Sequence, residues 1–359
     1  MGRLDASPPP QAGEGGARAS GREGAASEPI RKDPSRPSGL DRKRVIDLAE
    51  RFGLIVALLL LVLGFGVLEP TTFFTWSNLS STLGSQAVLV VITLGLIIPL
   101  TANDFDVSIA YVLTLSSMMI AVLNAQLGVP MWAAVLAALA TGVLVGLLNG
   151  LFITVFRIHS LIVTLGTGTF LHGVTLWISG SMTISGLDPS LIQYVIVDRV
   201  LGIPLEFYYA LALCILLWYV LERTAMGRRL LFVGRGREVA RLSGIDTDRV
   251  RLGCLVASSF MGALGGVLYA GTQGAADPSS GATYLLPAFA AAFLGSTSVI
   301  PGRFNPWGSL VAVYFLVTGI TGLVFLGVSS FVQDMFYGGA LVLAVTLSQI
   351  VRGREEQQF

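Results

Sequence analysis

The sequence contains about ten runs of mainly apolar residues, each close to the roughly 20 residues that an α-helix needs to cross a lipid bilayer. Backbone N–H and C=O groups cannot be left unpaired in hydrocarbon, so runs of this length favour helices. We predict an all-α, polytopic protein of the lipid bilayer with about ten transmembrane helices. Their centres lie near Leu60, Ile92, Leu115, Val143, Thr167, Leu213, Leu264, Ala291, Phe315 and Leu343.

The composition agrees with a membrane protein and gives no sign of an enzyme. Apolar residues make up 53% of the chain and charged residues 13%, proportions that a soluble globular domain does not show. Both cysteines, Cys214 and Cys254, lie in apolar runs, so neither a disulfide nor a metal cluster is expected. No lysine follows Lys43, and the Gly-rich phosphate-binding loop of an ATPase needs one. We therefore expect no catalytic residue, no metal, no cofactor and no nucleic-acid partner.

The distribution of charge predicts the orientation of the helices. Residues 1–40 are rich in Pro, Gly, Ser and charged residues, which predicts a disordered cytoplasmic tail. A basic juxtamembrane segment at 41–51 is expected to form a short helix, followed by a transmembrane domain at 52–351 and a second cytoplasmic tail at 352–359. Both termini are placed in the cytoplasm because positive residues are retained there. With that orientation the outer loops hold only Arg199, whereas the inner loops hold Arg157, Arg303, the tail residues Arg352 and Arg354, and a run of eight arginines.

The eight arginines lie in one loop, residues 222–251, between two apolar runs. Within it, residues 234–244 predict a short amphipathic helix that ends at Gly244, with Asp246 or Thr247 as the cap of the next span. Such a helix is suited to docking in a groove of a cytoplasmic partner. The alternative is a solvated basic loop that only sets the topology.

Polar residues interrupt the apolar sequence between the second and third spans. Asn103, Asp104 and Asp106 occur there, although a charged side chain at the bilayer centre costs about 2.5–3.5 kcal/mol on insertion scales. Two carboxylates two residues apart point about 200° apart on a helix, so a continuous helix would not direct both to one partner. We predict a broken helix or a tight turn near the inner side. Asp106 or Ser108 then either caps the third span or contributes to a translocation path.

Small and hydroxylated residues mark two further spans. Gly142, Gly146 and Gly150 recur every four residues, a spacing that permits close approach of a neighbouring helix. The fifth span carries Thr164 and Thr167 among glycines. Their hydroxyls suit either hydrogen bonding back to the preceding turn or the polar wall of a pore.

The loop and the interrupted helix belong to a longer series of motifs. In the loop, Glu238, Ala240 and Gly244 match the pattern Glu-Ala-Ala…Gly, followed by Arg-Leu-Ser-Gly-Ile at 241–245. The series continues with Phe-Asp-Val-Ser at 105–108, Gly-Leu-Leu-Asn-Gly-Leu at 146–151, Val-Thr-Leu-Gly at 163–166 and Leu-Gly-Ser-Thr at 294–297. In order and spacing, over residues 50–352, these motifs resemble the permeases of ABC importers, in particular the ribose/xylose-type sugar permeases.

The resemblance implies a permease subunit of the bacterial inner membrane that imports a sugar or a similar small polar solute. It implies that cytoplasmic ABC ATPase subunits dock on the coupling loop at 222–251, through Glu238, Ala240, Arg241 and Gly244. It also implies that an extracytoplasmic solute-binding protein delivers the solute to the outer loops, and that a second permease subunit, expected to be identical, completes a dimer. For the translocation path we expect Asp106, Ser108, Thr164 and Thr167.

The chain also departs from the family pattern. Asn103 and Ala110 stand where glycines usually flank the Asp-Leu-Ser motif, Pro287 lies within the eighth span, and 301–305 replace a Gly-Gly-Arg-Gly turn. These changes suggest a distinct branch whose solute need not be ribose. Two alternatives stay open: a branched-chain amino-acid ABC permease, and an ion-coupled secondary carrier that would need both Asp104 and Asp106.

Overall fold

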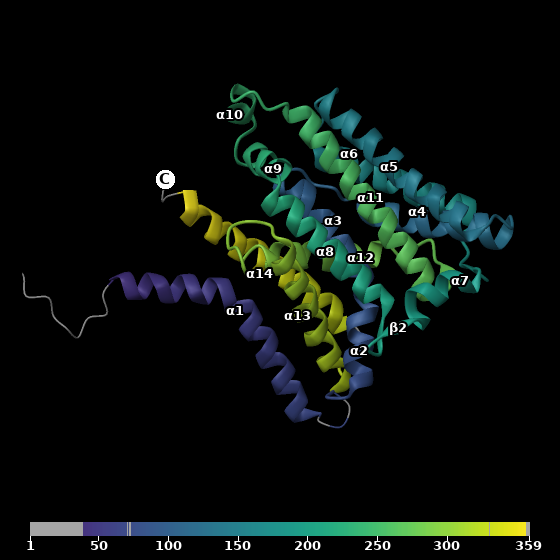
Figure 1. The fold of residues 1–359 in the computed structure, drawn as a ribbon, viewed down its shortest axis with the longest axis horizontal. Coiled ribbons are helices and arrows are strands. Elements are labelled where there is room, and N and C mark those ends of the chain that lie inside the picture. The colour runs from purple at the N-terminus through teal and green to yellow at the C-terminus, as the bar shows by residue number, and fades with distance from the viewer. Residues whose placement is uncertain (1–38, 70, 72, 330, 357–359) are drawn as a thin grey trace, which may run out of the picture. The chain divides into compact units, whose positions relative to one another are not determined.

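The structure is a computed structural model that describes residues 39–69, 71, 73–329 and 331–356 (Figure 1). The chain divides into two units, residues 1–43 and residues 44–359. Apart from residues 39 and 40, the predicted tail at 1–40 lies outside the described residues, as do the last three residues of the tail predicted at 352–359. Apart from the first residues of α1, the features discussed below belong to the second unit.

Helices account for almost all the regular structure. The segment at 41–51, expected to form a short helix, is helical as the first part of α1 (Gly39–Leu68). The remaining helices are α2 (Trp76–Ser85), α3 (Ala87–Thr101), α4 (Ile109–Ala121), α5 (Met131–Thr154), α6 (Ser160–Ser179), α7 (Pro189–Ile192), α8 (Leu205–Arg223), α9 (Ala225–Arg235), α10 (Arg237–Leu242), α11 (Thr247–Gln273), α12 (Ala282–Gly295), α13 (Pro306–Phe325) and α14 (Phe331–Glu356), with π-helical turns η1 (Val122–Gln126) and η2 (Gln193–Val197).

Four strands of two residues each pair in two small antiparallel ladders. The first joins β1 (Ile184–Ser185) to β4 (Ala275–Ala276), with Ile184 opposite Ala276. The second joins β2 (Arg199–Val200) to β3 (Ile203–Pro204) just before α8 begins. These ladders lie in connections between helices, so the fold is all-α as predicted.

Each of the ten predicted span centres lies in a helix, but the helices are not equal. Among the described residues, nine helical segments are long and apolar enough to cross a membrane; α2 and α3 together form one of them. The predicted eighth span is α12, which has 14 residues and is too short by that measure. It contains Pro287, and it ends at Gly295, where an added Cβ would lie 2.5 Å from the backbone N of Ser309. A short helix is tolerated because it packs against α3, α13 and α14 instead of facing lipid along its whole length.

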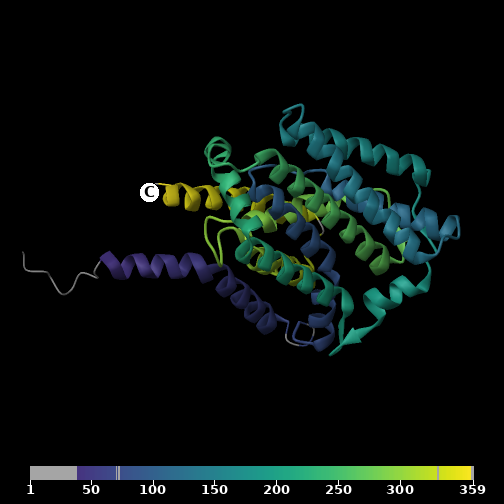
Figure 2. The same cartoon turned by 45° about the horizontal axis from the view of Figure 1, so that its top comes forward.

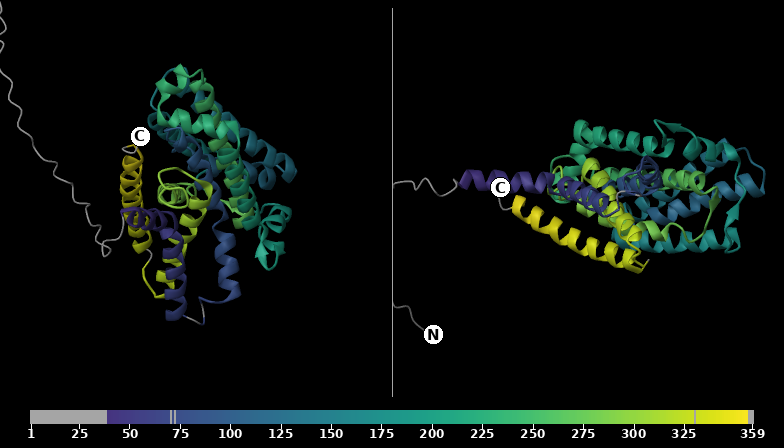
Figure 3. Two further views of the ribbon diagram at one scale, coloured as in Figure 1. Left: turned by 60° about the vertical axis from the view of Figure 1, so that its left-hand side comes forward. Right: turned by 90° about the horizontal axis from the view of Figure 1, so that it is seen from below.

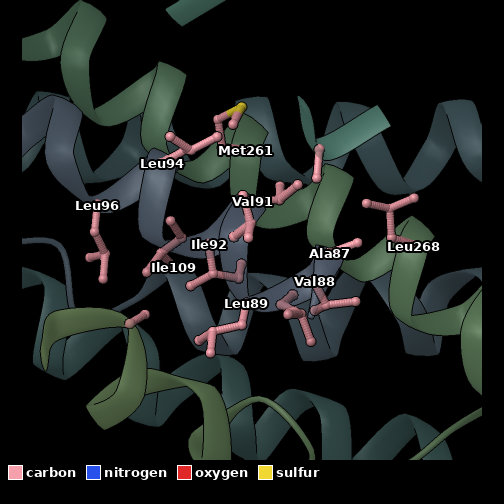
Figure 4. Close-up of a cluster of buried hydrophobic side chains, with 14 of the residues drawn as sticks. Ala87, Val88, Leu89, Val91, Ile92, Leu94, Leu96, Ile109, Met261 and Leu268 are labelled. Carbon is pink, nitrogen blue, oxygen red and sulfur yellow. The ribbon is translucent and has the colours of Figure 1, made fainter. Parts of the chain in front are cut away.

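The core is built around α3. All 15 residues of α3 are buried, and the helix is in contact with α4, α8, α11, α12 and α13. Figure 4 shows its Val91 and Ile92 among side chains from α4 and α11, including Ile109 and Met261. A helix that is apolar on every face belongs in such a position. Figure 2 shows the same helices turned by 45°, and in Figure 3 α14 is the yellow helix that leads to the C-terminus.

Glycines allow the helices around α3 to pack closely. An added Cβ at Gly146 of α5 would lie 2.6 Å from the Cα of Val256 on α11, and one at Gly266 of α11 would lie 2.5 Å from the carbonyl oxygen of Leu113 on α4. Neither position leaves room for a side chain. The close approach predicted from the Gly142, Gly146 and Gly150 spacing is therefore confirmed.

Candidate functional site

The interrupted helix predicted between the second and third spans is present. α3 ends at Thr101 and α4 begins at Ile109, and residues 102–108, here called the 102–108 turn, are not helical. The N–H groups of Asn103 and Asp104 donate to the carbonyls of Leu100 (3.1 Å) and Pro99 (3.0 Å). Asn103 is left-handed, with φ 57°. This combination is a Schellman motif with Asn in the place that glycine usually takes, and it ends α3 on local sequence alone.

Asp104 is held by two arginines from the loop at 222–251. Its Oδ1 accepts from Nη2 of Arg237 (2.9 Å) and from Nη2 of Arg251 (2.8 Å), and its Oδ2 accepts from Nε of Arg251 (2.7 Å). The Asp104 side chain is 1% exposed, that of Arg251 10% and that of Arg237 42%. Arg237 also donates to the carbonyl of Asn103 (3.0 Å). We call these three side chains the ion cluster.

Sequence reasoning missed the ion cluster. It treated all eight arginines as a topology signal or a docking surface, whereas Arg237 and Arg251 compensate a buried carboxylate. The signal was present, because a carboxylate in an apolar region is almost never buried without a partner. Which of the eight arginines would pair with Asp104 was not evident from sequence.

Asp106 has quite different surroundings. Its Oδ1 accepts from both the backbone N–H (3.0 Å) and the hydroxyl (2.5 Å) of Ser108, and Nδ2 of Asn149 donates to the same hydroxyl (2.8 Å). Ser258 of α11 faces the carboxylate without completing a hydrogen bond. All four side chains are fully buried. We call them the polar cluster; no ion pair of Asp106 occurs among the described residues.

Burial raises the pKa of Asp106 above its ordinary value, although the hydrogen bonds from Ser108 oppose this shift. Oδ2 of Asp106 and Oδ1 of Asn149 have no hydrogen-bond partner in the described part of the chain. Burial thus disfavours the charged form of Asp106, which lacks the arginine partners that Asp104 has. Ser108 is the residue before α4, but its hydroxyl makes no capping hydrogen bond; Asp106 accepts from the N–H of Ser108, in a turn directly before the helix.

α6 holds the backbone of the 102–108 turn through two hydroxyls. The N–H of Phe105 donates to Oγ of Ser160 (3.0 Å), and the N–H of Val107 donates to Oγ1 of Thr164 (3.1 Å). Thr164 is fully buried, while Thr167 is only half-buried and makes no hydrogen bond with the polar cluster. Three of the residues expected in a translocation path therefore meet at the turn, and the fourth lies one turn further along α6.

The loop at 222–251 forms two helices and the start of a third (Figure 1). The helix predicted at 234–244 is found as α10, but it begins only at Arg237 because Gly236 is extended and separates it from α9. α10 ends at Leu242, and the chain then turns at Gly244, the residue predicted to break the helix, which has φ 82°; the N–H of Ile245 donates to the carbonyl of Ala240 (3.0 Å). Asp246 caps α11 by accepting from the N–H of Arg249 (3.1 Å), which confirms the first of the two predicted caps.

α10 buries one side chain and presents the others. Ala240 is fully buried, whereas Val239 and Leu242 are 59% and 89% exposed. Glu238 and Arg241 are exposed as well, and Glu238 makes no hydrogen bond or ion pair with another described residue. We call α9, α10 and the residues up to Gly244 the docking segment. Its exposed face combines charge with two apolar side chains, as a docking helix requires.

A cleft of about 340 Å³ separates the docking segment from the connection between α5 and α6. It is lined by members of the ion cluster and by Arg157, His159, Arg241 and Asp248, among others. The ion cluster therefore borders space that solvent can enter. Among the described residues, no three His, Cys, Asp or Glu side chains are grouped so that they could hold a metal ion.

Comparison with known proteins gives a family match over most of the chain. The family described as branched-chain amino acid transport system / permease component matches residues 78–345. The D-allose transport system permease protein of Escherichia coli K12 is 28% identical over 84% of this chain and 92% of its own. The ribose import permease proteins of Escherichia coli K12 and Bacillus subtilis 168 are 30% and 31% identical, over 81% and 84% of this chain and 91% and 93% of theirs. No solved structure gave a significant match.

Proposed function

The chain belongs to the branched-chain amino acid transport system / permease component family, as a non-catalytic, multi-pass permease of the ABC importer type, and we propose that it imports a sugar or a similar small polar solute. The allose and ribose permeases to which it is similar carry those sugars in their names. The observation that supports the proposal best is the docking segment, which projects a short, mostly exposed helix from a buried bundle.

We assign the coupling role to Glu238, Ala240, Arg241 and Gly244. Ala240 anchors α10 to the protein, while Glu238 and Arg241 are free to meet a cytoplasmic ATPase. The positive φ of Gly244 turns the chain back into α11. Docking energy applied to α10 can then bias the bundle between two states, which is the physical requirement for coupling ATP hydrolysis to transport.

The partners of this permease are proposed on the same basis. Two ATPase subunits on the inner side and an extracytoplasmic solute-binding protein on the outer side would complete the importer. A second, identical permease subunit would provide the other half of a central path. Large apolar side chains are exposed on α6 and α14, including Phe170, Trp177 and Leu343, and these faces must meet either lipid or protein.

For the translocation path we propose Asp106, Ser108, Thr164 and Thr167. The first three are hydrogen-bonded at a break in a buried helix, where irregular backbone is tolerated only inside protein or along a water-filled cavity. They are buried in this structure. Contact with solute therefore requires the 102–108 turn to move, which fits a path that opens to one side at a time.

The test replaces Glu238 with Arg and Gly244 with Val. Both variants should insert into the membrane but lose uptake, the first because the docking charge is reversed and the second because a β-branched residue is strained at positive φ. Glu238→Gln and Gly244→Asn are the matched controls, since Asn tolerates a left-handed conformation. Normal uptake by both Glu238→Arg and Gly244→Val would remove the coupling assignment.

Native-membrane crosslinking, followed by purification of the chain and mass spectrometry, tests the partners. Recovery of an ATPase crosslinked near Glu238 supports the importer. The ligand of any recovered binding protein separates a sugar permease from a branched-chain amino-acid permease, the alternative that the family description names. An ion-coupled carrier predicts uptake without ATP. It also requires free carboxylates, and Asp104 is already paired with two arginines.

A further inference from the structure

The 102–108 turn is hydrogen-bonded to neighbouring segments on two sides. On one side the ion cluster joins Asp104 to the docking segment through Arg237 and to α11 through Arg251. On the other side the N–H groups of Phe105 and Val107 bond to the two hydroxyls of α6. The 102–108 turn is thus hydrogen-bonded both to the docking segment and to α6, the helix that carries Thr164 and Thr167.

We propose that Asp104 transmits movement of the docking segment to the 102–108 turn and from there to α6, with Arg237 as the contact that breaks and Arg251 as the one that persists. This inference rests on the proposed function, because it takes the ATPase as the source of the movement. Asp104 and Arg237 are positioning residues in this scheme, and neither needs to touch the solute.

The geometry assigns different strengths to the two arginine contacts. Arg251 approaches Asp104 with two nitrogens and is 10% exposed, so water does not replace it readily. Arg237 offers one nitrogen, is 42% exposed and borders the cleft beside α10. Exposed ion pairs are worth little in water, because solvent screens the charges and can take over the hydrogen bonds. A shift of α10 therefore releases Arg237 first and leaves the charge of Asp104 compensated.

A second contact strengthens the link between the docking segment and the turn. Gly234 of α9 lies against the end of α3, where an added Cβ would be only 1.9 Å from the carbonyl oxygen of Thr101. Arg237 in addition holds the carbonyl of Asn103. The docking segment thus contacts the last residue of α3 and two residues of the turn directly, so it cannot shift without changing the hydrogen bonds there.

The experiment follows α6 directly and does not depend on the identity of the solute. Thr167→Cys places a thiol on the half-buried face of α6, in a chain whose native Cys214 and Cys254 are buried. The full chain is purified in complex with its ATPase, and the rate of alkylation by a water-soluble maleimide is measured with and without ATP. With Arg237 intact, ATP should change the rate about fivefold or more, the lower range of typical coupling between sites.

Substitution at Arg237 is the decisive comparison. Arg237→Gln should abolish the ATP effect while the ATPase still co-purifies, and Arg237→Lys should restore part of it. Arg249→Gln is the matched loss of charge, since Arg249 pairs with the exposed Asp246 and, among the described residues, not with Asp104. An ATP effect of normal size in Arg237→Gln would overturn the inference.

Two further results also overturn it, and they are distinguishable from each other. If the ATPase is bound but ATP leaves Thr167→Cys unchanged even with Arg237 present, transmission through α6 is wrong while the importer assignment stands. If no ATPase accompanies the wild-type chain, the proposed coupling of the docking segment fails and the inference fails with it.

Discussion

The ion cluster and the polar cluster meet at the same seven-residue turn but surround their buried aspartates with different partners. Each contains one buried aspartate, and the two are separated by a single residue, Phe105. Asp104 is paired with two arginines that lie 133 and 147 residues away in sequence. Asp106 has no cation among the described residues and relies on Ser108 and Asn149.

The difference shows that burial alone does not give a carboxylate a role. A charge fixed by arginines ties distant segments together and is costly to disturb. A carboxyl group that is bonded only to nearby polar side chains ties no distant charge to it, and an amide of the same shape can replace it at little cost. The two aspartates should therefore respond to the same substitution by very different amounts.

Asp104→Asn should have the largest effect. It leaves Arg251 buried without its counter-charge, which is expected to lower the free energy of unfolding by about 3–5 kcal/mol. Unfolding of the purified protein in mixed micelles measures this loss. The double variant Asp104→Asn/Arg251→Gln should recover part of this loss, because Arg251 is then no longer a buried charge without a partner. If the double variant is instead destabilised by the sum of the two single losses, Asp104 and Arg251 are not coupled.

Gly234→Ala should come next. The new Cβ collides with the carbonyl of Thr101, and overpacking of this kind costs about 1–3 kcal/mol, less what alanine gains in helix propensity. Uptake should fall along with stability, because α9 must move away from α3. Gly236→Ala is the control two residues away, where the nearest side-chain atom would be 3.7 Å from the Cβ and φ is −176°; it should change stability by less than about 0.5 kcal/mol. The comparison fails if the two glycines behave alike.

Asp106→Asn should change stability at neutral pH by less than about 1 kcal/mol, because the amide preserves the shape of the side chain and removes a carboxylate that burial disfavours. The pH dependence has a definite sign. Since the pKa of Asp106 is raised in the folded state, its carboxylate lowers stability above that pKa, and this cost disappears as the pH falls towards the ordinary value of about 3.9. Wild type should gain stability relative to Asp106→Asn on acidification. If wild type instead loses stability relative to Asp106→Asn on acidification, the fold lowers the pKa of Asp106 and the interpretation is wrong.

Arg249→Gln should have the smallest effect on stability. Arg249 and Asp246 form an ion pair across one turn of α11, with side chains 89% and 53% exposed. Such pairs contribute about 0–1 kcal/mol and are screened by salt. Unfolding at low and high ionic strength should show a difference from wild type of less than about 0.5 kcal/mol that fades with salt. A larger value would place Arg249 with the ion cluster.

Much of the local structure was predictable because it depends on neighbouring residues. Asn103 and Gly244 end their helices in the left-handed conformation, and Asp246 caps α11, each in line with the sequence around it. The separation of α9 from α10 at Gly236 was not predicted, since an extended glycine and a helical glycine look alike in sequence. The short length of α12 was also missed, although polar residues flank it on both sides, so that its apolar run is itself shorter than a full span.

The sequence by itself determined that this chain is a bundle of membrane-spanning helices with one break after Thr101 and one arginine-rich loop, because span length, turn chemistry and charge distribution are local properties. Only the tertiary structure decided that Asp104 belongs to the loop and Asp106 to the bundle. Two identical side chains, two residues apart, cannot be distinguished by pattern. Which one meets a cation depends on where α10 and α11 lie in space, and that position is set by helix packing around α3.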